Sequence, residues 1–201
     1  MKNRNLTLLT DYYELTMMYG YFKKQMTKTR SVFDLFFRAN SESNYCIAAG
    51  LEQAVQYIEN LRFEKEQLDY LRSTKDFDED FLAYLENFRF SGDIYALEEG
   101  TVVFPGEPLM IVKAPIIEAQ LMESALLNIV NFQTLIATKA SRVAYVAQPG
   151  QVSEFGLRRA QGPDAGIYGA RAAMIGGCQA TSNVLTGQLF GVPVGGTHAH
   201  S

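Results

Sequence analysis

The sequence predicts an α/β protein in two parts, and two observations lead to this class. Residues 1–149 mix aromatic segments of period two with amphipathic helical stretches, which is typical of a mixed α/β domain with a long connecting helix. After Gly150, where most of the 16 glycines lie, short apolar strands alternate with short helices. This repetition is typical of a parallel α/β barrel or a doubly wound sheet, whose chemistry lies at the carboxyl ends of the strands.

The elements of the first part follow from spacing. Apolar residues at helical intervals predict a helix that begins at Asp11, with Thr10 as its expected cap. Alternating aromatic residues predict a strand at 31–39 and a second strand at 45–49. Residues 51–85 show helical periodicity and are expected to form more than one helix.

The second half of the chain contains the longest predicted helix. Residues 92–113 predict short strands with tight turns, and one apolar stripe predicts a single helix over 118–146 that ends at Gln148-Pro149-Gly150. The remaining strands are expected at 152–157, 179–182 and 192–197, and the helices between them at 165–175 and 183–190. Because a barrel needs more strands to close, we expect residues 150–201 to be the start of an incomplete barrel in a longer protein.

Composition argues against several classes of protein. The net charge of −4 and the absence of a long Lys/Arg run disfavour a nucleic-acid partner. The two cysteines, Cys46 and Cys178, are too few and too far apart for a disulfide framework or a cysteine zinc cluster, and they suit a reducing compartment. Neither a signal peptide nor a membrane-spanning run is predicted, so we expect a cytoplasmic protein without a membrane partner.

Two segments hold candidate groups for a planar or anionic ligand. In T-D-Y-Y-E-L-T at 10–16, Tyr13 can stack on a planar ligand, or it can be a half-buried packing residue of a capped helix. In E-F-G-L-R-R-A-Q-G-P-D at 154–164, Arg158 and Arg159 are expected at a strand end, where neighbouring side chains point to opposite faces, and Gly162-Pro163-Asp164 is expected to start a helix. Arginine binds carboxylates and phosphates through paired hydrogen bonds, but a salt bridge with Glu154 or Asp164 is an equal alternative.

Two further segments lie at later strand ends. Thr181, Ser182 and Asn183 can offer an anion site at a helix start, or one of them can simply cap that helix. In G-G-T-H-A-H-S at 195–201, His198 and His200 are two residues apart and share a face if the segment is extended. The pair allows a metal site, an acid–base or nucleophilic histidine, or a structural histidine that orients the other.

Taken together, these segments resemble the nicotinate phosphoribosyltransferase family. The resemblance rests on T-D-Y-Y-E-L-T-M-M-Y-G-Y, F-D-L-F-F-R, F-G-L-R-R-A-Q-G-P-D, T-S-N-V-L and G-T-H-A-H-S, in this order, and covers Leu8 to Ser201. It implies a type II phosphoribosyltransferase fold, with an α+β N-terminal domain followed by the start of an irregular α/β barrel. The implied reaction joins nicotinate to 5-phosphoribosyl 1-diphosphate for NAD synthesis, with ATP as co-substrate, Mg²⁺ as cofactor and a homodimer as the assembly.

The resemblance also implies roles for individual residues. It makes His200 the catalytic histidine that is phosphorylated by ATP, and it places Tyr13 and Thr197 in contact with nicotinate. Arg158 or Arg159 is implied to line the same site. Ser201 is a further candidate for substrate binding; contacts to phosphate, or support for such contacts, are expected from Asp164, Ser182, Asn183 and His198. No residue of the chain is assigned as a metal ligand.

Three other functions compete with this interpretation. A related enzyme could use nicotinamide, which gives an arginine less to bind, or quinolinate, whose two carboxylates should need more basic residues. A truncated, non-catalytic binding module is an alternative from another class. A metal-binding protein that uses His198 and His200 is the weakest alternative, because no carboxylate cluster lies nearby in the sequence.

Overall fold

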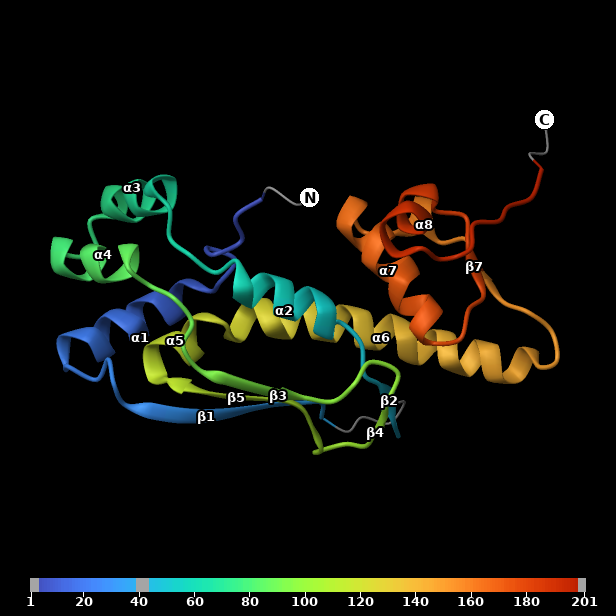
Figure 1. The fold of residues 1–201 in the computed structure, drawn as a ribbon, viewed down its shortest axis with the longest axis horizontal. Coiled ribbons are helices and arrows are strands. Elements are labelled where there is room, and N and C mark those ends of the chain that lie inside the picture. Colours follow the sequence, from blue (N-terminus) through green and yellow to red (C-terminus); the bar gives the residue numbers. More distant parts are fainter. Residues whose placement is uncertain (1–3, 39–43, 199–201) are drawn as a thin grey trace. The chain divides into compact units, whose positions relative to one another are not determined.

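The computed structural model describes residues 4–38 and 44–198 (Figure 1). They divide into two compact units. Unit 1 comprises Met1–Leu35, Glu52–Ala96 and Met110–Asn128, and unit 2 comprises Phe36–Leu51, Leu97–Leu109 and Ile129–Ser201. Each unit is therefore assembled from segments that are far apart in the sequence.

Unit 1 contains most of the predicted helices of the first half. Helix α1 packs against α5, and α3 packs against α4. Thr10 was expected to cap α1, but the N-cap is Asp11, and the hydroxyl of Thr10 instead donates to the carboxylate of Glu14. Asp11 makes no side-chain cap bond. The helices are α1 (Tyr12–Lys23), α2 (Leu51–Glu59), α3 (Lys65–Thr74), α4 (Glu79–Glu86) and α5 (Ile116–Leu121).

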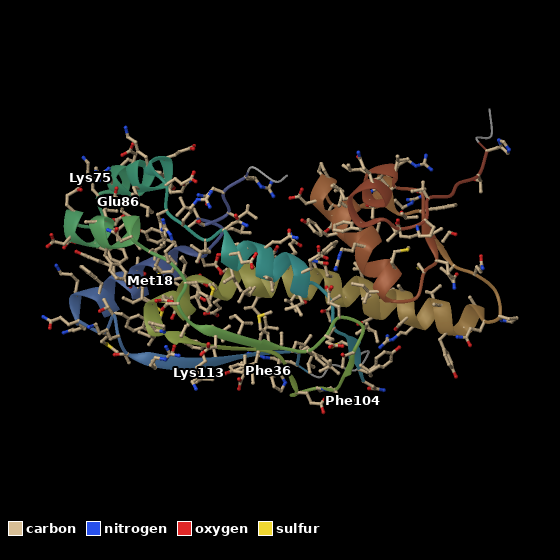
Figure 2. All side chains as sticks on the ribbon, in the orientation of Figure 1. Met18, Phe36, Lys75, Glu86, Phe104 and Lys113 are labelled. Atoms are coloured by element: carbon tan, nitrogen blue, oxygen red, sulfur yellow. The ribbon has the colours of Figure 1, made fainter. Side chains whose placement is uncertain are left out.

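Three strands form a sheet in the order β1-β5-β3. They are β1 (Arg30–Phe36), β3 (Asp93–Ala96) and β5 (Pro108–Pro115). Strands β3 and β5 are antiparallel, with Ile94 opposite Val112. The core of unit 1 is formed by large apolar side chains that are almost completely buried, among them Met18 of α1, which is labelled in Figure 2. Burying such a side chain stabilises the fold by about 1.5–3 kcal/mol.

The helix predicted over 118–146 is two helices. Helix α5 ends at Leu121, Met122 forms a turn, and α6 (Glu123–Ala147) follows. At the break the amide of Ser124 donates to the Glu14 carboxylate at 3.0 Å, so it is not used in a continuous helical hydrogen-bond ladder. A polar partner distant in sequence therefore interrupts an otherwise uniform apolar stripe.

Unit 2 contains a small antiparallel ladder in which β2 (Cys46–Ile47) pairs with β4 (Val102–Val103). Hydroxyls of α6 hold the segment around β2, since Thr138 accepts from the amide of Ile47 at 2.9 Å and Thr134 accepts from that of Ala49 at 3.3 Å. Ile47, Ala49, Ala137 and Ala172 form a buried apolar cluster. This cluster joins the β2 segment to α6 and to α7 (Pro163–Ile175) within the unit.

The predicted strand–helix rhythm is present after α6. Strand β6 (Ser153–Glu154) is parallel to β7 (Ala180–Thr181), and Thr181 forms a further parallel bridge with Val194. Between these extended segments lie the 3₁₀ helix η1 (Leu157–Arg159), α7 and α8 (Val184–Phe190), as Figure 1 shows for α7, β7 and α8. The strands expected at 152–157 and 192–197 are shorter than predicted, because the chain turns into η1 from Gly156 and pairs only at Val194.

Helix α7 lies unusually close to α6. A Cβ atom on Gly176 would lie 2.3 Å from the carbonyl oxygen of Ala137 and 2.6 Å from the Cβ of Ala140. Such distances are too short for any larger residue, so glycine allows the backbones to approach. The α/β class predicted from the sequence is confirmed, and no helix in the described part of the chain is both long and apolar enough to cross a membrane.

Candidate functional site

The candidate site lies at the carboxyl edge of the parallel strands in unit 2. Because β6, β7 and the Val194 segment are parallel, the residues that follow them leave the sheet at the same edge. Backbone hydrogen bonds hold the edge together: the amide of Ser182 donates to the carbonyl of Glu154, and that of Gly195 to the carbonyl of Thr181, each at 3.0 Å. The predicted site residues that follow these extended segments in the chain are Arg158, Arg159, Ser182, Asn183, Thr197 and His198.

Arg158 and Arg159 stand on η1 and are exposed. They were expected to point to opposite faces of a strand, and this expectation is wrong, because a 3₁₀ helix of three residues per turn separates neighbouring side chains by only about 120°. Among residues 4–38 and 44–198 neither guanidinium is found in an ion pair. Both positive charges are therefore available at the edge to an anionic ligand.

Glu154 and Asp164 were considered as salt-bridge partners of these arginines, but neither forms an ion pair with them among the described residues. Glu154 accepts a hydrogen bond from the hydroxyl of Thr181 at 2.7 Å and another from the amide of Gly156. Asp164 is partly buried in the first turn of α7, whose predicted start at Gly162-Pro163 is confirmed.

Asn183 is the N-cap of α8. Its Oδ1 accepts from the amide of Thr186 at 3.3 Å, and its Nδ2 donates to the carbonyl of Gly166 at 3.0 Å. Asn183 is buried, whereas Ser182 is half-buried. The structure thus gives Asn183 the capping role that the sequence analysis kept as an alternative to an anion site, while Ser182 lies nearer to solvent.

The last predicted segment is only partly described. Thr197 and His198 follow the Val194 bridge and are exposed. His200 and Ser201 lie outside the described residues. Within residues 4–38 and 44–198, no group of three or more histidine, cysteine or acidic side chains is arranged to hold a metal ion.

Tyr13 belongs to unit 1, so it is described apart from this edge. It lies in the first turn of α1 with 46% of its surface exposed, which leaves its ring accessible to a ligand. Desolvation, a hydrogen bond to Glu123 and the nearby acidic charges raise the pKa of Tyr13 to about 12. Its hydroxyl is therefore a neutral donor at physiological pH.

Two carboxylates organise these regions, and neither of their structural roles was predicted from the sequence. Glu14, directly after Tyr13, is fully buried and accepts from both the amide and the hydroxyl of Ser124, at 3.0 and 2.8 Å. Desolvation raises the pKa of Glu14 and outweighs these hydrogen bonds. The other is Glu154, and in both cases the only sequence signal was a glutamate inside a motif.

The cysteines behave as the sequence predicts for small apolar residues. Cys46 is buried in β2, and desolvation raises the pKa of its thiol to about 11. Cys178 is half-buried, and desolvation followed by the charge of Glu154 raises its pKa as well. Both thiols therefore stay protonated and weakly nucleophilic at neutral pH.

Comparison with known proteins assigns this architecture to a family. Residues 8–131 match the family model described as the nicotinate phosphoribosyltransferase (NAPRTase) N-terminal domain. Nicotinate phosphoribosyltransferase of Bacillus subtilis (strain 168) is 48% identical over 201 residues, which is 100% of this chain and 41% of that protein. The protein of the same name from Caenorhabditis elegans is 43% identical and is covered over 35% of its length.

Solved structures agree with the sequence relatives. The crystal structure of human nicotinic acid phosphoribosyltransferase aligns with a TM-score of 0.88 and 39% identity, over 95% of this chain and 39% of that one. Nicotinate-nucleotide pyrophosphorylase from Pyrococcus furiosus aligns with a TM-score of 0.76 at 23% identity, over 98% of this chain and 43% of that one, and so supports the fold. The type II phosphoribosyltransferase fold expected from the sequence is thereby confirmed.

These relatives extend well beyond the aligned region. The chain spans about two fifths of the length of its curated relatives from Bacillus subtilis and Mycobacterium tuberculosis. The family model covers more than half of the chain, and the sequence relatives align along nearly all of it. The chain belongs to the nicotinate phosphoribosyltransferase family.

Proposed function

We propose that the protein transfers a phosphoribosyl group from 5-phosphoribosyl 1-diphosphate to nicotinate, giving nicotinate mononucleotide and diphosphate in NAD biosynthesis. Membership of the family supports the reaction class. The observation that carries the assignment to this chain is the carboxyl edge of unit 2, where two exposed arginines stand without an ion pair among the described residues. An anionic acceptor suits such an edge, because a guanidinium pairs with a carboxylate through two parallel hydrogen bonds.

The reaction needs orientation and electrostatic stabilisation more than covalent help from the protein. The lone pair of the pyridine nitrogen forms a bond to the anomeric carbon, and the bond from that carbon to diphosphate breaks with its electrons leaving on diphosphate. Positive charge develops on the ribose in between. In this proposal Arg158 or Arg159 fixes the carboxylate of nicotinate, and Thr197 contacts its ring. Tyr13 is proposed as a nicotinate contact by resemblance to the family alone.

We further propose that ATP hydrolysis is coupled to this reaction through His200. A neutral imidazole nitrogen can accept the γ-phosphoryl group of ATP, with ADP as the leaving group, and water later releases phosphate. A phosphohistidine at position 200 would add negative charge close in sequence to Thr197 and His198, and so would reorganise the site for its substrates. Replacing His200 by Gln should abolish this ATP hydrolysis and with it the stimulation of product formation by ATP.

The proposal includes Mg²⁺, which would neutralise charge on the diphosphate that leaves. The described residues do not form a metal site by themselves, and none of the steps above depends on a metal ligand from this chain. A cytoplasmic homodimer also belongs to the proposal, by resemblance to the family. Light scattering of the purified whole protein would measure the mass of its assembly.

An acceptor comparison tests the proposed function. The whole protein would be assayed with phosphoribosyl diphosphate and Mg²⁺, with and without ATP, and with nicotinate, nicotinamide or quinolinate in turn. We expect product chiefly from nicotinate, with stimulation by ATP that is lost in His200→Gln. Product chiefly from one of the other acceptors would overturn the substrate, and a folded protein that is inactive with all three would support a binding module.

Variants of the two arginines separate their roles. Replacing the arginine that pairs with the carboxylate by Ala should raise the KM for nicotinate by about tenfold to a hundredfold. This is the usual effect of losing a hydrogen-bonded charge partner. Lys at the same position should recover only part of this affinity, because an ammonium cannot pair through a planar fork. An unchanged KM in both Arg158→Ala and Arg159→Ala would contradict this placement.

A further inference from the structure

The carboxylate of Glu154 connects the strand ends from which the candidate site is built. Glu154 is the last residue of β6, and its side chain accepts from the hydroxyl of Thr181 on β7 at 2.7 Å. The same carboxylate accepts from the amide of Gly156, the residue that precedes η1. One side chain therefore joins the end of β7 to the turn that carries the arginines.

The direction of these hydrogen bonds calls for a side chain that accepts at both of its oxygens. The hydroxyl oxygen of Thr181 accepts from the amide of Asn183 at 3.0 Å, so its own proton is directed to Glu154. The amide of Gly156 is also an obligatory donor. Two donors thus face one side chain, and an ionised carboxylate is the side chain that only accepts. Thr181 itself is fully buried, so water cannot replace its partner.

The geometry of the turn shows how closely it follows this carboxylate. A Cβ atom built on Gly156 would lie 2.8 Å from Oε1 of Glu154, so carboxylate and backbone are already in tight contact. Gly156 in turn accepts at its carbonyl from the amide of Arg159 at 2.8 Å. The chain of contacts therefore runs from Thr181 through Glu154 and Gly156 to the backbone of the second arginine.

We propose that Glu154 is a positioning residue for the acceptor: it fixes the β6–η1 turn so that an arginine of η1 meets the carboxylate of nicotinate. This inference rests on the proposed function, but the ordering of the turn by Glu154 can be measured without it. Glu154 itself touches no substrate in this arrangement. Its loss should weaken acceptor binding and leave the chemical step nearly intact.

The test uses the whole protein with Glu154→Gln and Thr181→Val, which remove the acceptor-only group and its hydroxyl donor respectively. We expect each variant to raise the KM for nicotinate about tenfold, the usual effect of losing one hydrogen bond to a charged group, while kcat changes less than about twofold. Thr181→Ser keeps the hydroxyl and should retain the KM of the unmodified protein. Amide hydrogen exchange of residues 155–160 should be faster in Glu154→Gln and Thr181→Val than in Thr181→Ser.

The outcomes separate this inference from the proposed function. Variants that melt earlier but keep the KM and the local exchange rate of the unmodified protein would show that Glu154 serves stability alone and would overturn the inference. An unmodified protein that is inactive with nicotinate would refute the proposed function. In that case faster exchange confined to 155–160 would still support the ordering of the turn, and unchanged exchange would overturn it.

Discussion

The ion pair between Glu99 and Arg171 offers the most quantitative prediction for unit 2. Arg171 donates to both carboxylate oxygens of Glu99, at 2.9 and 2.6 Å, and the side chains are only 12% and 18% exposed for Arg171 and Glu99 respectively. Glu99 also accepts from the amides of Gly50 and Leu51, at 2.6 and 3.1 Å. Four donors therefore converge on one carboxylate. We expect the loss of this carboxylate to lower the free energy of unfolding far more than the loss of a surface ion pair does.

Replacing Glu99 by Gln isolates this effect. The amide oxygen can still accept from Gly50 and Leu51, but the amide nitrogen then faces the guanidinium of Arg171, and two donors meet. Breaking a buried pair costs about 3–5 kcal/mol, and we expect about 2–3 kcal/mol here because Arg171 keeps one hydrogen bond and lies over the ring of Phe190, 5.4 Å from its centroid. For a chain of 201 residues this lowers Tm by roughly 5–10 °C.

A double-mutant cycle measures the pair itself. Urea unfolding followed by circular dichroism would compare Glu99→Gln, Arg171→Met and the double variant. We expect the double variant to be more stable than the sum of the single effects predicts, by more than about 1 kcal/mol, because removing both partners leaves no unpaired charge. The control is Arg72→Met, which removes the exposed pairs with Glu79 and Asp69 and should destabilise the fold less than Arg171→Met does. Additive single effects would refute the reasoning.

Three further predictions concern stability. Desolvation raises the pKa of Glu99, but Arg171 and the two amides outweigh it and hold the pKa below its ordinary 4.5, so the stability from this carboxylate is complete above pH 4.5 and is lost as pH falls through the lowered folded-state pKa. An acid titration of unfolding should show a smaller loss in Glu99→Gln than in the unmodified protein. Gly176→Ala should destabilise by about 1–3 kcal/mol through overpacking, whereas Gly20→Ala in α1, with nothing within 4 Å of the new Cβ, should stabilise by about 0.4–1 kcal/mol; equal Tm values would contradict both. Because desolvation raises the pKa of Glu14, its carboxyl stabilises the fold fully below pH 4.5 and this contribution is lost as pH rises through the raised folded-state pKa. Glu14→Gln should therefore gain relative stability between pH 4.5 and 7.5, and a loss over that range would refute the assignment.

Much of the fold could be predicted because it depends on local signals. Gly162 and Pro163 identify the start of α7, and Asn183 identifies that of α8, because caps and the first helical turn have chemical requirements that a short segment displays. The strand–helix rhythm after residue 150 predicts the parallel segments for the same reason. From these, the common edge of the candidate site follows by topology alone.

The features that could not be predicted depend on partners distant in sequence. The stripe over 118–146 is helical throughout, and its break at Met122 arises where Glu14, 110 residues from Ser124, takes an amide from the helix. The faces of Arg158 and Arg159 were predicted wrongly because a two-residue strand followed by a 3₁₀ turn looks in sequence like one longer strand. The conformation of such a turn depends on the hydrogen-bond partners of its backbone, and some of these partners are distant in sequence.

Three carboxylates, Glu14, Glu99 and Glu154, each accept hydrogen bonds from residues that are distant in sequence. Their replacement by Gln should nevertheless lower the free energy of unfolding by different amounts. Thr10 also contacts the carbonyl of Leu121, at 3.3 Å, so its proton can turn there and its oxygen can accept from a glutamine at position 14. Near Glu154, the oxygen of Thr181 already accepts from another amide, which makes such a reversal harder. At Glu99 the opposing donor is a guanidinium, which can never accept. The cost of the substitution should therefore rise from Glu14 through Glu154 to Glu99, in the order in which the neighbouring donor loses the ability to become an acceptor.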